Sequence, residues 1–362
     1  MRVMHPARLL AIFAVVSVLG AACGGAAPDT GAPGDTGEGD QGAASDVTVG
    51  MALDVGGLGD KSFNDAANAG LQRAIEEGLV SEGNVELLEA NQTGSNRDEN
   101  ITTLADQGFD LVIAVGFAFS EHVAEIAPEF PDTNFAIIDG FATFIAENDN
   151  VVDLTFKEHE GSFLVGAAAG MTTETNTVGF LGGQEGTGLI EKFQAGYEAG
   201  VAETCPDCEV LVEYIGDSTQ AFVDPTRGEA LSEDMYDQGA DVIYHAAGQS
   251  GLGLFKAAVE QGPDALAIGV DSDQYLTASP EEQPHIITSM LKRVDTAVFE
   301  AIQAQVDGTF EPGQQVFGLA EEGVDYATSN PDLLTEDIQA QLDTFKEQII
   351  SGEITVPEEP QG

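Results

Sequence analysis

The 362-residue chain is strongly acidic, with 63 Asp and Glu residues against 12 Lys and Arg residues and a formal net charge of −51 at pH 7. A surface of this charge repels the phosphates of nucleic acids and of anionic lipids, so the composition argues against both as direct partners. The hydrophobic content of 43% is ordinary for a folded protein. The chain is also longer than one hydrophobic core usually serves, which predicts two lobes.

The N-terminus has the features of an export signal. A basic and then apolar segment covers residues 1–19, and the small residues 20–22 stand directly before Cys23. This order is typical of a secretory signal peptide, and the apolar run is too short to span a bilayer. A cysteine at this place resembles a bacterial lipoprotein signal, although Gly20 occupies the position where that signal usually has leucine. Residues 1–22 are therefore predicted to be removed and Cys23 to be lipidated.

A composition typical of a flexible tether follows. Residues 23–46 contain no aromatic or branched aliphatic side chain. Such a segment cannot bury enough apolar surface to fold, and as a random coil it would reach roughly 25–30 Å. We therefore expect a folded body held away from a membrane surface.

From residue 47 onward, short apolar runs alternate with longer amphipathic segments. The apolar runs predict strands at 47–53, 85–89, 111–115, 134–138, 150–155, 177–181, 210–215, 242–245 and 267–270. The amphipathic segments predict helices at 63–77, 101–107, 121–129, 161–171, 188–202, 225–238, 251–260 and 294–305. Strand–helix alternation implies parallel sheets covered by helices, and two blocks of it imply two α/β lobes.

Acidic residues directly follow three of these strands. They are Asp54, Asp139 and Asp271. Open parallel sheets bind ligands beyond the carboxyl ends of their strands, so all three point toward one cleft if the lobes face each other. Three carboxylates in one cleft could form a metal site or an acid/base pair, or could accept hydrogen bonds from ligand hydroxyls. A single Asp after a strand more often caps the next helix. A metal is the least favoured of these because the residues are far apart in the sequence.

Cys205 and Cys208 form a C-x-x-C pair. In a cytosolic protein this pair would suggest redox chemistry or half of a zinc site. A zinc site needs about four ligands, and no other cysteine remains once Cys23 is lipidated. In an exported chain the pair instead favours a small disulfide that closes a turn, with no metal.

Motifs for nucleotide or hydrolase chemistry are missing from the sequence. The loop 183–188 reads G-x-x-G-x-G and not the dinucleotide-binding G-x-G-x-x-G. Neither a P-loop nor a G-x-S-x-G motif occurs. We predict no cofactor and no enzymatic activity.

Several stretches match a known family. They are 54–57, 60–64, 155–157 with 160–163, 178–183, 236–243, 245–248, 269–274 and 288–295. Together they resemble the basic membrane protein family of substrate-binding lipoproteins, which includes the purine nucleoside receptor type. The resemblance runs from about residue 47 to residue 327 and so covers nearly all of the predicted folded part.

The resemblance implies a type I periplasmic-binding-protein fold, in which two Rossmann-like lobes clamp a ligand in the cleft between them. It further implies a nucleoside ligand, with purine types preferred, and an ABC transporter permease as partner. The base would lie between Phe63 and a second ring, which is either Phe222 or Phe193. Asn64 and Asp139 would contact the edge of the base.

The remaining implied contacts concern the ribose. Asp271, Lys292 and the backbone of Gly248 would hold its hydroxyls, with Asp54 at the cleft floor. General physics agrees with a nucleoside ligand. Stacking of a base on an aromatic ring contributes about 1–3 kcal/mol and tolerates different bases. An acidic cleft also accepts a neutral nucleoside more readily than a nucleotide, because it repels phosphate.

The expected lobes are 47–155 with about 281–320, and 156–280 with about 321–362. We expect a monomer that is anchored by lipid on the extracytoplasmic face of the cell membrane. Three alternatives remain open. The same fold could bind a free sugar or other small polyol, the protein could be a ligand sensor for a membrane receptor, or the cleft aspartates could serve a nucleoside hydrolase.

Overall fold

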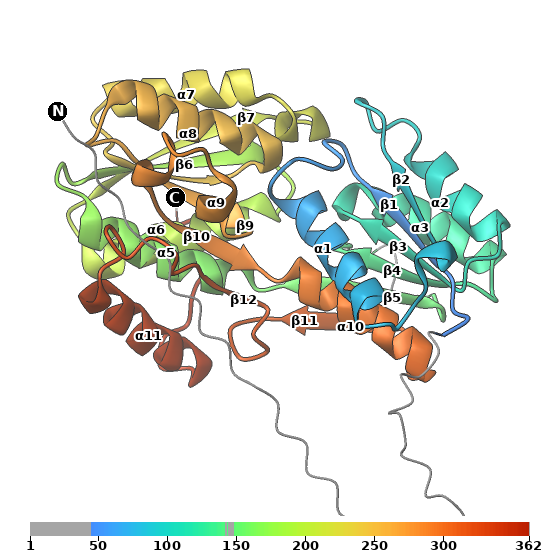
Figure 1. Ribbon diagram of the computed structural model, residues 1–362. Helices are drawn as coiled ribbons and strands as arrows, with labels where there is room; N and C mark the ends of the chain where they lie inside the picture. Colours follow the sequence, from blue (N-terminus) through green and yellow to red (C-terminus); the bar gives the residue numbers. More distant parts are fainter. Residues whose placement is uncertain (1–44, 142, 144–147, 362) are drawn as a thin grey trace, which may run out of the picture. The chain divides into compact units, whose positions relative to one another are not determined.

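The computed structural model describes residues 45–141, 143 and 148–361 (Figure 1). The predicted signal peptide, Cys23 and the predicted tether up to residue 44 lie outside the described residues. Ser45, which was assigned to the tether, forms a parallel bridge with Val80. The described chain from residue 45 onward belongs to one compact unit that contains two sheets.

Six parallel strands form the first sheet, in the order β11-β5-β4-β3-β1-β2. They are β1 Val49–Leu53, β2 Val85–Glu89, β3 Leu111–Val115, β4 Asn134–Ile138, β5 Val151–Phe156 and β11 Gly313–Phe317. β1 and β3 are buried at every residue, as expected for strands covered by helices on both faces. The strand order reverses between β1 and β3, and such a reversal is where open parallel sheets bind ligands.

The second sheet repeats this arrangement in the order β12-β10-β9-β8-β6-β7. Its strands are β6 Thr177–Gln184, β7 Glu209–Gly216, β8 Val242–Ala246, β9 Leu266–Asp271, β10 Ile286–Lys292 and β12 Val324–Tyr326. All neighbours are parallel except β12, which pairs antiparallel with β10. The predicted class of two α/β lobes with parallel sheets is therefore confirmed.

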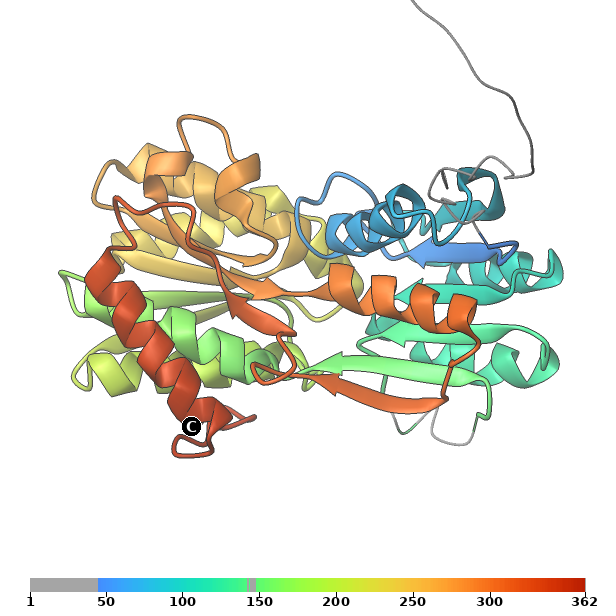
Figure 2. The same ribbon diagram turned by 60° about the horizontal axis from the view of Figure 1, so that its bottom comes forward.

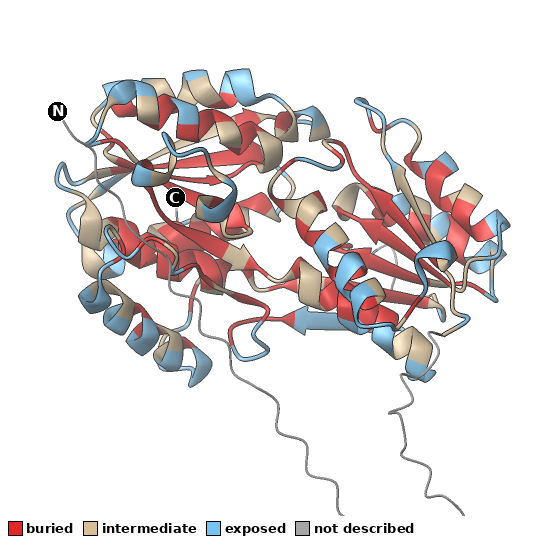
Figure 3. Ribbon diagram, viewed as in Figure 1, coloured by how far each residue is buried: buried red, intermediate tan, exposed pale blue. Residues whose placement is uncertain are grey.

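Helices cover both sheets. α1 (Phe63–Glu76) packs on α10 (Val294–Asp307), and α2 (Arg97–Asp106) contacts α3 (Ser120–Ile126), all beside the first sheet. Beside the second sheet, α5 packs on α6 and α7 on α8, while α11 contacts α5. The bounds are α5 Glu158–Thr172, α6 Ile190–Thr204, α7 Pro225–Asp237, α8 Leu252–Gln261, α9 Gln274–Thr277 and α11 Glu336–Ile350. Figure 3 shows buried strands beneath helices whose outer faces are exposed.

Short 3-10 segments connect several of these elements. They are η1 Glu82–Asn84, η2 Phe117–Phe119, η3 Ala127–Glu129, η4 Thr219–Phe222, η5 Gly248–Gly251 and η6 Gln283–His285. Three of them, η2, η4 and η5, carry residues at the carboxyl ends of strands. They are therefore placed where a ligand would bind.

The close packing of α5 on α6 depends on glycine. A Cβ atom at Gly166 would lie 2.2 Å from the carbonyl oxygen of Tyr197, and one at Gly200 would lie 2.0 Å from that of Phe163. No side chain fits at such distances without moving backbone. This packing fixes the start of α5, where Glu158 is fully buried.

The chain passes between the two sheets three times. It crosses from β5 to α5 at Lys157, from β10 to α10 at Arg293, and from β11 to β12 through residues 318–323. In Figure 2, β5 and β11 run side by side at the edge of the first sheet, as their parallel pairing requires. Below, the first lobe means the first sheet with its helices, and the second lobe means the second sheet with its helices.

The predicted lobe boundary at residue 281 is wrong for β10. The strand itself was not predicted, and its residues fell within the stretch of about 281–320 assigned to the first lobe, but it pairs with β9 over Ile286–Leu291 and so belongs to the second sheet. The return to the first lobe occurs only after Lys292, where α10 begins and packs on α1. Because β10 contains polar residues, its sequence lacks the continuous apolar run that predicts a buried strand.

Other predicted elements differ at their ends. Residues 101–107 were predicted as part of a helix, and that helix begins at Arg97, whereas α6 begins at Ile190 and not at residue 188. The elements that were not predicted at all are β10, β11, β12, α9 and α11. β11 is exposed at four of its five residues, so its sequence lacks the apolar run that marks a buried strand.

Candidate functional site

A cavity lies where the carboxyl ends of the two sheets meet. The empty space within it, counted together with the open solvent at its mouth, is about 680 Å³. Every residue that the sequence predicted to contact the ligand lines this cavity: Asp54, Phe63, Asn64, Asp139, Phe193, Phe222, Gly248, Asp271 and Lys292. The structure thus brings together side chains that are widely separated in the sequence.

Further residues line the same cavity and were not predicted. Phe117, the first residue of η2, follows β3 just as Asp54 follows β1. The rule that directed attention to strand ends would therefore also have found Phe117. Leu189 and Ile190 add apolar surface from the start of α6, and Gln249 adds an amide from η5.

Aromatic rings enter the cavity from both lobes. Phe63 begins α1 in the first lobe, and Phe222 ends η4 in the second. Phe222 lies edge-on to Phe117, with 6.2 Å between ring centroids and 68° between ring planes. Phe193 of α6 is 3% exposed, and the ammonium of Lys292 lies 5.4 Å from its centroid. Both candidates for the second stacking ring, Phe193 and Phe222, are therefore present.

A buried charge cluster lies beside two of the crossings. The Lys292 ammonium donates a hydrogen bond of 2.6 Å to Oδ2 of Asp139 and lies 3.0 Å from Oε1 of Glu158. Lys292 ends β10 and Glu158 begins α5, so each lies next to a point where the chain changes lobes. Burial alone would lower the pKa of Lys292, but the surrounding carboxylates outweigh burial and raise it. Lys292 therefore stays charged in this cluster.

Two aspartates near Lys292 have a raised pKa and so bind protons more readily than usual. Burial raises the pKa of Asp139 and that of Asp271 to about 6, although Lys292 opposes both shifts. Within the described part of the chain, Oδ1 of Asp139 has no hydrogen-bond partner. A buried acceptor without a partner is unfavourable, so this oxygen is suited to accept a hydrogen bond from a ligand.

A second acidic group lies farther along the cavity. Oδ1 of Asp54 accepts hydrogen bonds from Arg97 Nε at 2.6 Å and from the backbone N–H of Val55 at 2.7 Å. Burial raises the pKa of Asp54, and Arg97 counteracts this shift. Arg97 was not singled out from the sequence, because nothing in its neighbourhood signals that a helix beginning there reaches Asp54.

Asn64 is already engaged within the protein. Its side-chain oxygen accepts from the backbone N–H of Asp54 at 3.1 Å, and its amide donates to Oδ2 of Asp60 at 3.0 Å. Asp60 also accepts from the backbone N–H groups of Ser62 and Asn64, at 2.9 and 2.8 Å. Asp60 therefore secures the first turn of α1, which carries Phe63 into the cavity.

Two of the strand-end acids have a left-handed backbone, with φ of 60° at Asp139 and 64° at Asp271. Aspartate tolerates this region better than most residues, though at some energetic cost. Strained positions of this kind persist at sites where the surrounding structure holds a side chain for function. Here the turns bring both carboxylates into the cavity.

The two lobes touch across the rim of the cavity. The Ser62 hydroxyl donates to Oδ2 of Asp271. The Lys61 ammonium donates to the Thr277 carbonyl at 2.9 Å, and the Gln274 amide donates to the Lys61 carbonyl at 3.1 Å. The structure therefore has the lobes in contact around the cavity.

Two features lie away from the cavity. Cys205 and Cys208 form a disulfide bond in the turn between α6 and β7. Across residues 45–141, 143 and 148–361, no helix has the length and apolar character needed to cross a membrane.

The fold is that of the solute-binding proteins of ABC transporters. A crystal structure of an ABC transporter solute-binding protein from Aeropyrum pernix matches with a TM-score of 0.73 and 30% identity, over 87% of this chain and 94% of that one. Residues 47–360 match the model of the Bmp family, described as ABC transporter substrate-binding proteins of the PnrA-like type. The chain belongs to this family, which the sequence motifs had indicated.

Two relatives illustrate the range of names within the family. A CD4+ T-cell-stimulating antigen of Listeria innocua is 35% identical over 356 residues, which cover 95% of each chain. The ABC transporter nucleoside-binding protein BmpA of Lactococcus lactis is 31% identical over 86% of this chain and 90% of its own. The family is one of substrate-binding proteins of ABC transporters.

Proposed function

We propose that the protein is a lipid-anchored, extracytoplasmic binding protein that captures nucleosides, purine types preferred, for an ABC importer. The two lobes close over the ligand by bending at the three crossings between them. Cys23 carries the lipid, and the segment from there to residue 44 holds the body away from the membrane. Support comes from the family and from the name of the Lactococcus relative.

The observation that carries the proposal is the composition of the cavity wall. Aromatic rings from both lobes face the same space as several buried carboxylates and one buried ammonium group. The rings suit a planar base, and the charged groups suit hydroxyls, which both donate and accept hydrogen bonds. Phosphate is disfavoured because acids outnumber cations in the wall.

The hydrogen bonds within the cavity support separate places for the ribose and for the base of the ligand. Asp139 is bonded to Lys292, whereas Asn64 is bonded beside Asp54. We therefore assign Asp139, together with Lys292 and Asp271, to the ribose hydroxyls, in place of the base edge that the resemblance implied. The base would then lie toward Asp54, next to Phe63.

Titration calorimetry of the purified protein in high salt tests the proposal. The ligands are inosine, guanosine, adenosine, cytidine and ribose. Tight binding of a nucleoside without a ribose signal supports it and ranks the bases. Binding of ribose alone, or of nothing in a folded sample, contradicts it. Chromatography of the ligand after long incubation separates binding from hydrolysis, since a hydrolase would release the free base.

Removing either stacking ring should weaken nucleoside binding. Phe63→Ala and Phe222→Ala should each lower the affinity by about 1–3 kcal/mol, because each deletes one face of the base slot. Calorimetry measures the loss, and Phe193→Ala decides which ring of the second lobe is the larger contributor. Phe109→Ala is the matched control, since Phe109 is partly buried but does not line the cavity. Near-native affinity in both Phe63→Ala and Phe222→Ala would rule out the sandwich.

Asp271→Ala should weaken the binding of inosine far more than the binding of hypoxanthine. The reason is that its carboxylate would contact the ribose and not the base. The variant also loses the contact with Ser62, so Ser62→Ala serves as control, because it removes that contact and keeps the carboxylate. Equal losses for inosine and hypoxanthine would exclude Asp271 from the ribose site.

A further inference from the structure

Arg97 occupies a position that is unfavourable for a cation. It is the first residue of α2, and the N-terminus of a helix carries partial positive charge. Arg97 is also only 8% exposed. A buried cation needs a close counter-charge, and Oδ1 of Asp54 provides it at 2.5 Å from Nη2 and 2.6 Å from Nε.

The local backbone is shaped around this guanidinium. Gly94 has a φ of 69°, and a Cβ atom there would lie 2.1 Å from Nη1 of Arg97. Only glycine both adopts this conformation freely and leaves room for the side chain. The backbone of the first lobe therefore holds the Arg97 side chain in one defined position.

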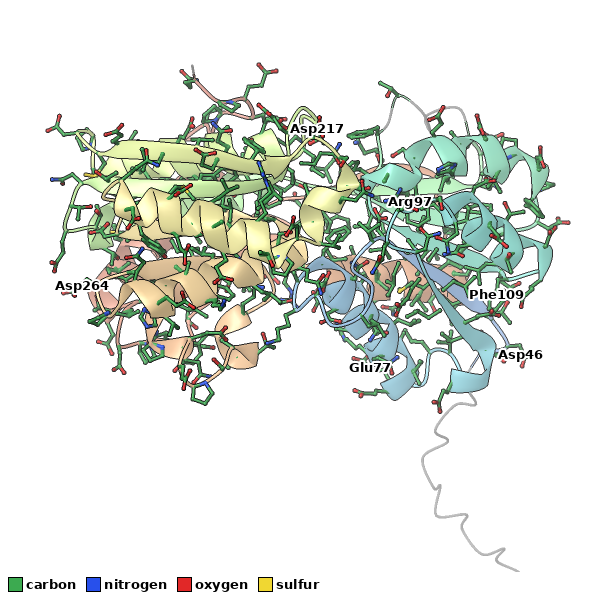
Figure 4. The ribbon with its side chains drawn as sticks, turned by 90° about the horizontal axis from the view of Figure 1, so that it is seen from above. Asp46, Glu77, Arg97, Phe109, Asp217 and Asp264 are labelled. Atoms are coloured by element: carbon green, nitrogen blue, oxygen red, sulfur yellow. A yellow bond between two sulfur atoms is a disulfide. The ribbon has the colours of Figure 1, made fainter. Side chains whose placement is uncertain are left out.

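One contact of Arg97 reaches the other lobe. Its Nη2 donates to the hydroxyl of Thr219 at 3.2 Å. Thr219 begins η4, and Phe222 ends the same short segment. In Figure 4, Arg97 lies on the side of the first lobe that faces the second. The same guanidinium thus touches a carboxylate of the cavity wall and the segment that carries a cavity ring.

We propose that Arg97 is a positioning residue that links lobe closure to the placement of Phe222. Its bonds to Asp54 stay within the first lobe and persist when the lobes separate. Its bond to Thr219 exists only when they are closed. Closure therefore brings η4 into contact with the Arg97 guanidinium, which Asp54 already orients. The inference rests on the proposed function in one respect, namely that closure retains the ligand.

Thr219→Val tests the link with little change in volume, because it replaces a hydroxyl by a methyl group. The bond is absent in the open form, so we expect dissociation to become faster and association to stay the same. With guanosine as the probe, stopped-flow measurements should show dissociation faster by about 10- to 150-fold, the range expected for a hydrogen bond to a charged donor. The midpoint of thermal unfolding should be unchanged. If Thr219 had a purely structural role, faster dissociation would be accompanied by a lower midpoint.

Arg97→Lys provides the second arm. A single ammonium can keep the pairing with Asp54 but lacks the fork that reaches Thr219 as well. Its dissociation rate should rise as in Thr219→Val, and the double variant should be no faster than either single variant. Thr344→Val is the matched control, because Thr344 is exposed on α11 and donates only within its own helix.

Each outcome decides the matter. Faster dissociation without additivity supports the link. An unchanged dissociation rate in Thr219→Val, or full additivity in the double variant, overturns the link. In either case the proposed function stands if the wild type binds a nucleoside. If the wild type binds no nucleoside, the proposed function fails, and small-angle scattering of the ligand-free chain decides instead. A larger radius of gyration in Thr219→Val than in the wild type then supports the link, and an equal radius overturns it when the wild type has the compact radius calculated from the structure.

Discussion

Lys292→Met is expected to lower the free energy of unfolding by about 3–5 kcal/mol, the range found when one partner of a buried ion pair is removed. Lys292 is 2% exposed and lies 2.6 Å from Asp139 and 3.0 Å from Glu158. Methionine fills the space but leaves buried Asp139 without its bonded cation, and leaves buried Glu158 with only Lys192, whose ammonium lies 3.9 Å from Oε2. Those groups must then bind protons or remain charged at high energetic cost.

Urea denaturation at neutral pH measures this effect. Lys256→Met is the control, because Lys256 pairs with Glu229 on the surface, where solvent screening leaves an ion pair little effect on stability. Adding Asp139→Asn to Lys292→Met should recover part of the lost stability, since it removes one uncompensated charge. A loss below about 1 kcal/mol in Lys292→Met would show that the cluster is far more hydrated than its burial implies.

Asp153→Asn should stabilise the protein above neutral pH. Asp153 is 1% exposed on β5, and burial together with the nearby Asp139 raises its pKa to about 7 from an ordinary value near 3.8. The folded state therefore binds more protons than the unfolded state between about pH 4 and pH 7, so stability falls as pH rises through this window. At pH 8 the variant should be more stable by on the order of 2–4 kcal/mol, and near pH 4 the advantage should vanish.

Thermal unfolding at a series of pH values checks the sign and the size of this effect. The wild type should gain stability on acidification from pH 8 to pH 5, opposite to the usual acid response of paired carboxylates. Asp217→Asn is the matched control, since Asp217 is exposed and labelled in Figure 4 on the second lobe. A wild-type pH profile identical to that of Asp153→Asn would mean that Asp153 is not the group that titrates.

The sequence predicted those parts of the fold that depend on local pattern. β3 and β4 have the predicted bounds, because a continuous apolar run between polar ends marks a strand buried on both faces. The position of Asp54, Asp139 and Asp271 directly after strands was enough to place them in one cavity, since parallel strands bring their carboxyl ends to the same edge.

Contacts between distant segments could not be predicted in the same way. Nothing near Arg97 indicates that its side chain reaches Asp54 and Thr219, which only the folded chain brings close. Likewise, the bond between Lys292 and Asp139 depends on how β10 lies relative to β4. The roles of these residues toward a ligand remain predictions for the same reason.

The interleaving of the two sheets also governs how the protein can be made. β11 completes the first sheet beside β5, yet it is encoded near the end of the chain, after every strand of the second sheet except β12. A fragment that stops before Gly313 would expose the edge of β5, a template for pairing with other chains. The first lobe therefore cannot be expressed as an independent domain by truncation, and a ribosome must finish most of the protein before that lobe can acquire its final edge.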